Sequence, residues 1–174
     1  MRTEIRIAGF GGQGVVLAGL LLGEAAIRDG KCAVQTQSYG PESRGGAARS
    51  EVVISNQEID YPKVFEADIL VALSQAAFDK YRPFVKENCT IIIDSDLVKA
   101  EEDKTYSVPF TRIADILGKK VVANSVMLGY LQASTEIISV ESMEATIREK
   151  VPDHTIAINL KAFNRGIKFW NKEK

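Results

Sequence analysis

A glycine-rich turn near the start of the chain is the first place where residue types and spacing point to chemistry. It lies between a short strand expected at Ile5–Ala8 and a helix expected at Val15–Asp29. The turn matches the pattern G-x-G-x-x-G, and its candidate binding residues are Gly9, Gly11, Gly12, Gln13 and Gly14. Glycines in such a turn let backbone N–H groups at a helix start approach an anion, typically a phosphate. The same glycines could serve only a tight strand–helix turn, so the motif alone leaves anion binding and packing equally open.

The end of the next expected strand, Cys32–Gln37, argues against NAD. Folds that bind NAD carry an acidic residue at this point, which holds the ribose hydroxyls. Here the sequence is Gln35-Thr36-Gln37-Ser38, without a carboxylate. Arg44, farther along, keeps a stand-alone NADP-type reductase module open as an alternative. A nucleotide-hydrolysing P-loop is excluded, because Gln13-Gly14-Val15 stands where Gly-Lys-Ser/Thr is required.

A second loop, Ser38–Gly46, provides Ser43 and Arg44 as further binding candidates. Its sequence SYGPESRGG contains three glycines and a proline. Loops that follow the carboxyl ends of strands are where open α/β sheets bind ligands. An arginine flanked by small residues can make paired, charge-assisted hydrogen bonds to a phosphate or carboxylate. The simpler alternative is a turn with a solvated Arg44.

Composition excludes several classes of function. The 174 residues include 22 Lys and Arg and 23 Asp and Glu, for a net charge of −1, which disfavours nucleic-acid binding and a polybasic membrane contact. Two cysteines, Cys32 and Cys89, cannot hold an iron–sulfur cluster that needs four thiolates. We expect both to be reduced and buried, and we expect neither a metal nor a tightly held cofactor in this chain. The start of the chain shows no signal peptide, and no apolar run is long enough to span a membrane, which predicts a cytoplasmic protein.

The pattern of apolar residues predicts an α/β fold in a single domain, residues 1–174. Buried parallel strands are expected at Ile69–Leu73, Thr90–Ile93 and Tyr106–Val108, a helix at Gln75–Glu87, and mostly helix from Ile113 onward. Alternation over Ala48–Ser55, with a return strand at Ile59–Tyr61, predicts a β-hairpin inserted at the edge of the sheet. The expected architecture is therefore Rossmann-like, with a mostly parallel sheet, an inserted edge β-hairpin and a helical C-terminal region. The first helix is apolar on most sides and the last has an apolar face ending at Trp170, which predicts a large interface with a partner.

The two glycine-rich loops together resemble one known family. Gly9-Phe10-Gly11-Gly12-Gln13-Gly14-Val15, followed by the run from Gln35 to Gly46, is similar to the gamma subunit, or gamma domain, of 2-oxoacid:ferredoxin oxidoreductases. The resemblance covers nearly the whole chain, and the pair of loops is far more specific than the glycine motif alone. Within this family, the sequences of the two loops are more similar to those of 2-oxoglutarate enzymes than to those of pyruvate enzymes.

This resemblance implies a subunit that cannot act alone. Its partners would be alpha and beta subunits, with a small ferredoxin-like delta subunit in some complexes. The complex would convert a 2-oxoacid to its acyl-CoA by oxidative decarboxylation and pass the electrons to ferredoxin. Thiamine diphosphate and iron–sulfur clusters would belong to the partners, and coenzyme A would lie near the glycine loop and Arg44. A purely structural role in assembly is a third hypothesis beside the NADP-type module.

Overall fold

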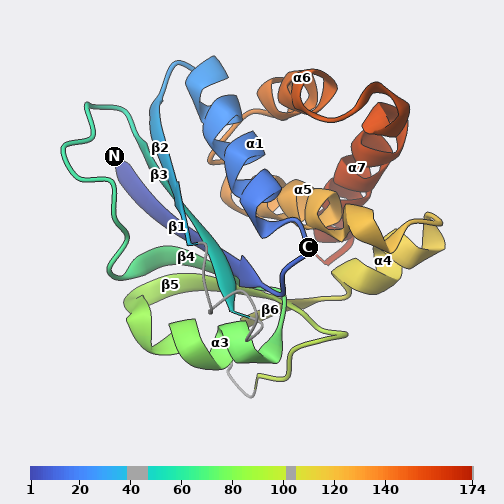
Figure 1. Cartoon of the computed structure of the whole chain (residues 1–174), viewed down its shortest axis with the longest axis horizontal. Helices are drawn as coiled ribbons and strands as arrows, with labels where there is room; N and C mark the ends of the chain where they lie inside the picture. The colour runs from blue at the N-terminus through green and yellow to red at the C-terminus, as the bar shows by residue number, and fades with distance from the viewer. Residues whose placement is uncertain (39–46, 101–104, 174) are drawn as a thin grey trace.

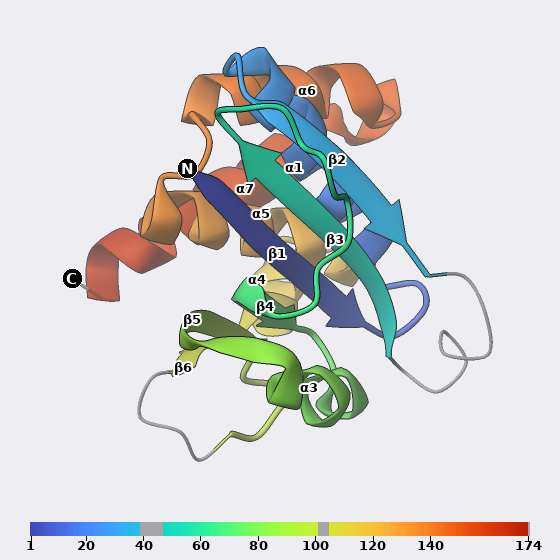
Figure 2. The same cartoon turned by 90° about the vertical axis from the view of Figure 1, so that its left-hand side faces the viewer.

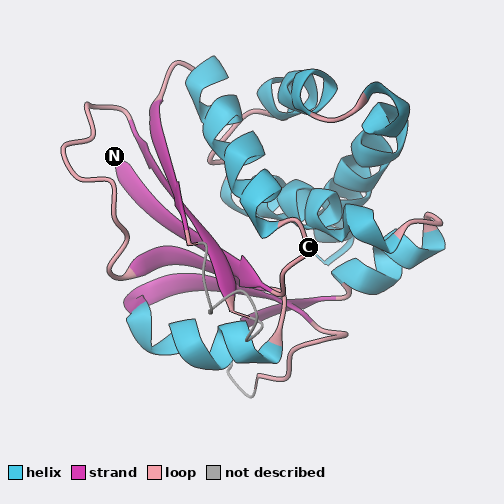
Figure 3. Ribbon diagram, viewed as in Figure 1, coloured by secondary structure: helices cyan, strands magenta, loops and turns pink. Residues whose placement is uncertain are grey.

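The fold is built on one twisted sheet with helices on both faces (Figures 1 and 3). The computed structural model describes residues 1–38, 47–100 and 105–173. Within these residues the strands run in the spatial order β2-β3-β1-β4-β5-β6. Their bounds are β1 (Arg2–Gly9), β2 (Cys32–Gln37), β3 (Ala48–Ser55), β4 (Ala67–Ala72), β5 (Val85–Asp94) and β6 (Thr105–Val108).

The sheet is mostly parallel, as predicted, and β3 is the exception. β1, β4, β5 and β6 pair in parallel, whereas β3 pairs antiparallel with both β1 and β2. The antiparallel pair at the sheet edge therefore consists of β2 and β3, and β3 is inserted between β2 and β1. The prediction of a return strand at Ile59–Tyr61 is wrong, because these residues do not form a strand.

Burial explains why the alternation in β3 predicts a hairpin with the following segment, whereas β3 actually pairs with β1 and β2. The alternation in β3 places Glu51 opposite apolar residues, which is typical of a half-exposed edge strand. Glu51 is nevertheless buried, because its carboxylate pairs with the guanidinium of Arg6 on β1 at 2.8 Å. The segment that follows β3 crosses the outer face of the sheet (Figure 2), where Val64 packs against Val53.

The helices divide unequally between the two faces of the sheet. α3 (Gln75–Tyr81) covers one face, and the remaining helices lie on the other (Figure 1). These are α1 (Val15–Arg28), α4 (Phe110–Ile116), α5 (Ala123–Thr135), α6 (Val140–Lys150) and α7 (Ile156–Glu173). α3 is shorter than the predicted helix over Gln75–Glu87. Pro83 has no backbone N–H to continue the helical hydrogen bonds, and after a short 3-10 turn at Arg82–Phe84 the chain enters β5 at Val85.

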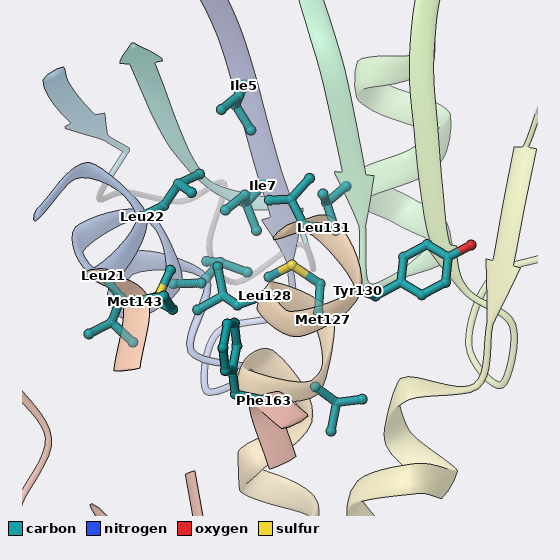
Figure 4. Close-up of a cluster of buried hydrophobic side chains, with 14 of the residues drawn as sticks. Ile5, Ile7, Leu21, Leu22, Met127, Leu128, Tyr130, Leu131, Met143 and Phe163 are labelled. Atoms are coloured by element: carbon teal, nitrogen blue, oxygen red, sulfur yellow. The ribbon is translucent and has the colours of Figure 1, made fainter. Parts of the chain in front are cut away.

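The larger core lies between the sheet and the helices of the more populated face. Figure 4 shows Ile5 and Ile7 of β1 facing side chains of α1 and α5, with α6 and α7 closing the cluster. α5 is the central helix, and its residues from Asn124 to Gln132 are all buried. A smaller core around Phe78 and Tyr81 of α3 fills the other face.

α5 and α7 cross at very short range, and two glycines make this possible. A Cβ atom on Gly129 would lie 1.9 Å from the carbonyl oxygen of Phe163, and one on Gly166 would lie 2.0 Å from that of Val126. Trp170 then stacks edge-on against Tyr130, with ring centroids 5.5 Å apart. The apolar face of α7 is thus covered within the chain, as is most of α1. Most of the apolar surface on these two helices is therefore buried within the chain, although Leu20 and Ile27 of α1 stay exposed, and the partner interface predicted there stays a prediction.

The two cysteines occupy different environments. Cys89 is buried in β5, as predicted, and burial raises the pKa of its thiol to about 11. Cys32 was predicted to be buried but is exposed, because it begins the edge strand β2. In the described part of the chain no helix is long and apolar enough to cross a bilayer.

Candidate functional site

The glycine-rich turn joins the end of β1 to the start of α1. Gly12 and Gly14 both adopt positive φ angles, of 94° and 72°, which side chains rarely tolerate. Gly14 is the N-cap of α1, and no side chain caps the helix there. The turn therefore leaves the first backbone N–H groups of α1 without a side-chain partner, as the motif predicted.

The side chain of Gln13 folds back over the turn instead of projecting away from it. Its Oε1 accepts a hydrogen bond from the backbone N–H of Phe10 at 2.5 Å, and its Nε2 donates to the carbonyl of Leu73 at 2.8 Å. Leu73 follows β4, so Gln13 ties the turn to the neighbouring strand. Gly9 leaves room for this contact, because a Cβ atom there would lie 2.4 Å from Oε1. Both polar atoms of this candidate binding residue thus have partners within the chain.

Asn124, at the start of α5, holds the other end of the turn. Its Nδ2 lies 3.5 Å from the carbonyl oxygen of Gly14, and a Cβ atom on Gly14 would lie 2.5 Å from the same nitrogen. Gly14 is consequently required both for its backbone angle and for this close approach. Sequence reasoning missed Asn124, because nothing in the chain marks a contact across such a long separation.

A pocket of about 280 Å³ opens beside the turn, at the carboxyl ends of β1, β4 and β5. α1 follows β1 on one face of the sheet and α3 follows β4 on the other (Figure 1), so the pocket lies where the chain direction switches. Open α/β sheets bind their ligands in this crevice. Its lining residues are Gly12, Gln13, Leu73, Asp94, Leu97, Thr111, Lys120, Val121 and Ala123.

The electrostatics of this pocket favour an anion on one side. α1 and α5 both begin beside it, and neither helix has an acidic residue in its first turn. The N-cap residue of each helix makes no side-chain cap, although at α5 the N–H of Ser125 donates to Oδ1 of Asn124 at 2.9 Å. Helix N-termini carry partial positive charge, so two that converge on one pocket reinforce each other. Lys120 adds a full positive charge. Its side chain is 67% exposed, and its Nζ lies 3.7 Å from Oδ2 of Asp115.

Asp94 forms the opposite wall and has a structural role. Its carboxylate accepts hydrogen bonds from the N–H and hydroxyl of Thr111, at 3.1 and 2.6 Å, and so caps α4. Burial raises the pKa of Asp94, and these hydrogen bonds act in the opposite direction. Asp96 likewise accepts from the N–H of Arg112 at 2.9 Å. No group of ligands suited to a metal ion occurs among the described residues.

Two predicted site residues, Ser43 and Arg44, lie outside the described residues. The two ends of their loop are fixed: the N–H of Ser38 donates to the carbonyl of Arg49, and the Tyr81 hydroxyl donates to the carbonyl of Ala47 at 2.9 Å. Of the candidate residues, Gly12 and Gln13 line the pocket, whereas Gly9, Gly11 and Gly14 belong to the same turn but are not part of its lining.

The position of β3 weighs against the NADP-type alternative. In a dinucleotide-binding fold the strand that carries the ribose-binding residue is next to β1. Here β3 separates them, so β2 lies about 10 Å from β1, twice the usual strand spacing. The end of β2 is therefore displaced from the pocket as well as lacking a carboxylate.

The fold and the glycine turn define an α/β protein with a candidate binding site at the carboxyl edge of its sheet. Comparison with known families identifies the family. The chain matches the family of pyruvate ferredoxin/flavodoxin oxidoreductases over residues 4–169 and belongs to it. It is 55% identical to the 2-oxoglutarate synthase subunit KorC of Methanocaldococcus jannaschii, with 95% of this chain and 92% of that protein aligned. The predicted family is therefore confirmed.

Solved structures agree on the fold. The gamma subunit of a keto/oxoacid ferredoxin oxidoreductase from Geobacter sulfurreducens superposes with a TM-score of 0.86 at 42% identity, covering 98% of this chain and 99% of that one. A 2-oxoglutarate:ferredoxin oxidoreductase chain from Magnetococcus marinus, solved with 2-oxoglutarate, coenzyme A and succinyl-CoA, has a TM-score of 0.87. At 23% identity this second likeness concerns the fold. This chain covers 98% of its own length there but 31% of that longer chain.

Proposed function

We propose that this chain is the gamma subunit of a 2-oxoglutarate:ferredoxin oxidoreductase and that its pocket binds part of coenzyme A. The observation that carries the first statement is the 55% identity to a KorC subunit over nearly the full length of both proteins. In the proposed reaction, 2-oxoglutarate loses carbon dioxide, its acyl group is transferred to coenzyme A, and the electrons pass to ferredoxin.

The chain supplies a binding surface to this reaction and leaves the redox chemistry to its partners. Its two cysteines lie on β2 and β5, with three strands between them in the sheet, and so do not fit an iron–sulfur cluster. Thiamine diphosphate and the clusters are accordingly assigned to the alpha, beta and, where present, delta subunits. The complex is assigned to the cytoplasm.

The chemistry of coenzyme A matches the pocket. Its diphosphate and ribose phosphate are anionic, and the starts of α1 and α5 together with Lys120 provide positive potential at the wall of the pocket. Ser43 and Arg44 are proposed to extend this surface from the second loop. In this arrangement Gln13 and Asn124 position the glycine turn and do not contact the ligand.

Lys120→Ala in the assembled complex tests the pocket. Removing the ammonium group raises the Michaelis constant for coenzyme A by about threefold to tenfold, the range for losing one partly exposed charge-assisted contact. The Michaelis constant for 2-oxoglutarate stays unchanged. The matched control is Lys63→Ala, at an exposed lysine remote from the pocket, which leaves both constants unchanged. Unchanged kinetics for coenzyme A in Lys120→Ala would refute the assignment.

Arg44→Ala tests the second loop separately. If its guanidinium holds a phosphate, the loss is about 1.5–3 kcal/mol, the range for a hydrogen bond to a charged group, and so about tenfold or more in apparent affinity for coenzyme A. Arg44→Lys restores part of this, because lysine cannot make the paired hydrogen bonds. A variant that assembles with wild-type kinetics would assign the loop a structural role, and one that fails to assemble would assign Arg44 to a subunit contact.

A further inference from the structure

A row of basic side chains runs along α7. Steps of four, three and four residues separate Lys161, Arg165, Lys168 and Lys172, and all of them are exposed. This spacing places the side chains on one face of the helix. We call these residues the basic stripe; at 1.5 Å per residue it is about 16 Å long.

The basic stripe has no acidic partner among the side chains that the structure describes. The nearest acidic residue on α4, Asp115, pairs with Lys120 instead. Like charges at these spacings destabilise a helix by about 0.2–0.5 kcal/mol per pair. The helix dipole favours cations only in the last turn, which accounts for Lys172 but not for Lys161 or Arg165. The chain has a net charge of −1, so the stripe is a local concentration of positive charge.

An apolar groove of about 180 Å³ adjoins the basic stripe, between α4 and α7. Ile113, Ile116 and Leu117 of α4 form one wall, and Phe169 lies on the other. Ile116 is 76% exposed, so the apolar surface of this wall reaches solvent. Three residues of the stripe, Arg165, Lys168 and Lys172, complete the lining, so the groove is apolar at its floor and cationic at its rim.

We propose that the basic stripe and this groove dock an acidic segment of a neighbouring subunit of the complex, with an apolar side chain of that segment in the groove. The inference rests on the subunit role proposed above but not on the coenzyme A pocket. Charge complementarity identifies the partner: cations spaced over about 16 Å match carboxylates along an extended or helical segment better than one small anion. A nucleic acid fits less well, because the chain as a whole repels a polyanion and the groove is apolar.

Carbodiimide cross-linking of the assembled complex tests this directly, because the reagent joins a lysine amine to a carboxylate that already contacts it. We expect Lys161, Lys168 or Lys172 to be linked to an Asp or Glu of another subunit. Acetylation of the same lysines is expected to be slower in the complex than in the free chain. Equal acetylation in both states, or links only within this chain, would overturn the proposal.

Arg165→Glu combined with Lys168→Glu tests the charge. The double variant should lower the affinity of this chain for the remaining subunits at least tenfold at low salt and weaken the salt dependence of assembly. Its helix should stay folded, because the changes place opposite charges four residues apart. Lys63→Glu, the control, should leave the affinity unchanged. Ile116→Asn should also weaken assembly, and it tests the apolar groove alone because it adds no charge.

The outcomes separate this proposal from the coenzyme A assignment. If the double variant binds the other subunits normally but loses affinity for coenzyme A, the basic stripe is a small-anion site and the docking proposal is wrong. If assembly weakens while the Michaelis constant for coenzyme A in the residual complex is unchanged, the docking proposal holds, whatever Lys120→Ala shows.

Discussion

At the scale of single residues, the side chains around the glycine turn position its backbone. Gln13 lies in the middle of the glycine motif, yet its amide joins Phe10 to Leu73 and so fixes the turn against β4. Gly9 and Gly14 are needed because polar side chains, Gln13 and Asn124, approach them closely. The anion-binding capacity of the turn therefore belongs to backbone N–H groups, which these contacts hold in place.

The two thiols should differ sharply in reactivity. The thiolate is the reactive form, and burial both shields Cys89 and raises its pKa to about 11, whereas Cys32 is exposed. Titration of the native chain with a thiol-specific disulfide reagent at pH 8 should modify Cys32 rapidly and leave Cys89 unmodified, until denaturant exposes it. Cys32→Ser should abolish the rapid phase. Rapid modification of both thiols in the folded chain would contradict the burial of Cys89.

At the scale of elements, a carboxylate links α1 to α6. Asp29 accepts hydrogen bonds from the N–H and hydroxyl of Ser139, both at 2.6 Å, and from the hydroxyl of Ser142 at 2.5 Å. Burial acts to raise the pKa of Asp29, but these hydrogen bonds outweigh it and lower the pKa below its ordinary 3.8. The contribution to stability is therefore complete above that ordinary value and is lost as the pH falls through the lowered pKa.

Asp29→Asn should accordingly destabilise the chain in a pH-dependent manner. We expect a loss of about 1.5–3 kcal/mol in the free energy of unfolding at pH 7, since a charged acceptor is replaced by a neutral one. The difference from wild type should shrink as the pH falls below 3.8. Urea unfolding at several pH values measures this difference in the free energy of unfolding. Asp60→Asn, at an exposed position, is the control. A loss that is the same at every pH would refute the linkage.

The crossing of α5 and α7 should be intolerant of one added methyl group. Gly129→Ala would push Cβ against a backbone carbonyl that cannot move aside, so we expect a loss of about 1–3 kcal/mol or more. Gly23→Ala in α1 is the matched control, because its Cβ would lie 3.9 Å from Val52, an ordinary contact. That change should stabilise the chain by about 0.5–1 kcal/mol through helix propensity. If both variants shifted the urea midpoint in the same direction, the close crossing would be in doubt.

Local sequence patterns determined most of the elements but not their long-range pairing. The helix from Val15 follows from the glycine turn before it and from Gly30, which adopts the positive φ expected after a helix, and the strand at Cys32–Gln37 comes directly after this helix. The insertion of β3 between β1 and β2 places Glu51 beside Arg6 in a buried ion pair, and no local sequence pattern indicates this long-range pairing. For the same reason the glycine turn was predicted, whereas Asn124 and Lys120 were not.

At the scale of the whole molecule, most of the apolar surface predicted to meet a partner is buried inside the chain. Trp170 and the face of α7 that it ends pack on α5, and most of α1 packs on the sheet and the helical layer, although its Leu20 and Ile27 stay exposed. Two other surfaces are open to solvent: the pocket at the carboxyl edge of the sheet, and the groove between α4 and α7 with the basic stripe beside it. We have proposed coenzyme A binding for the first surface and docking of a neighbouring subunit for the second.

If this chain binds coenzyme A and the partner subunits carry the redox cofactors, the isolated chain and the complete enzyme should differ in colour and activity. The isolated chain should be colourless, without stoichiometric iron or sulfide, since its two cysteines cannot hold a cluster, and it should not reduce a viologen dye with 2-oxoglutarate and coenzyme A. The remaining subunits should carry the colour, and their activity should be low until this chain is added. Titrating the chain into them should raise the rate to a plateau at a fixed ratio of subunits, with the largest gain when coenzyme A is below saturation. Full activity without the chain would refute a role in binding substrate, and activation that does not depend on the concentration of coenzyme A would leave it an assembly subunit.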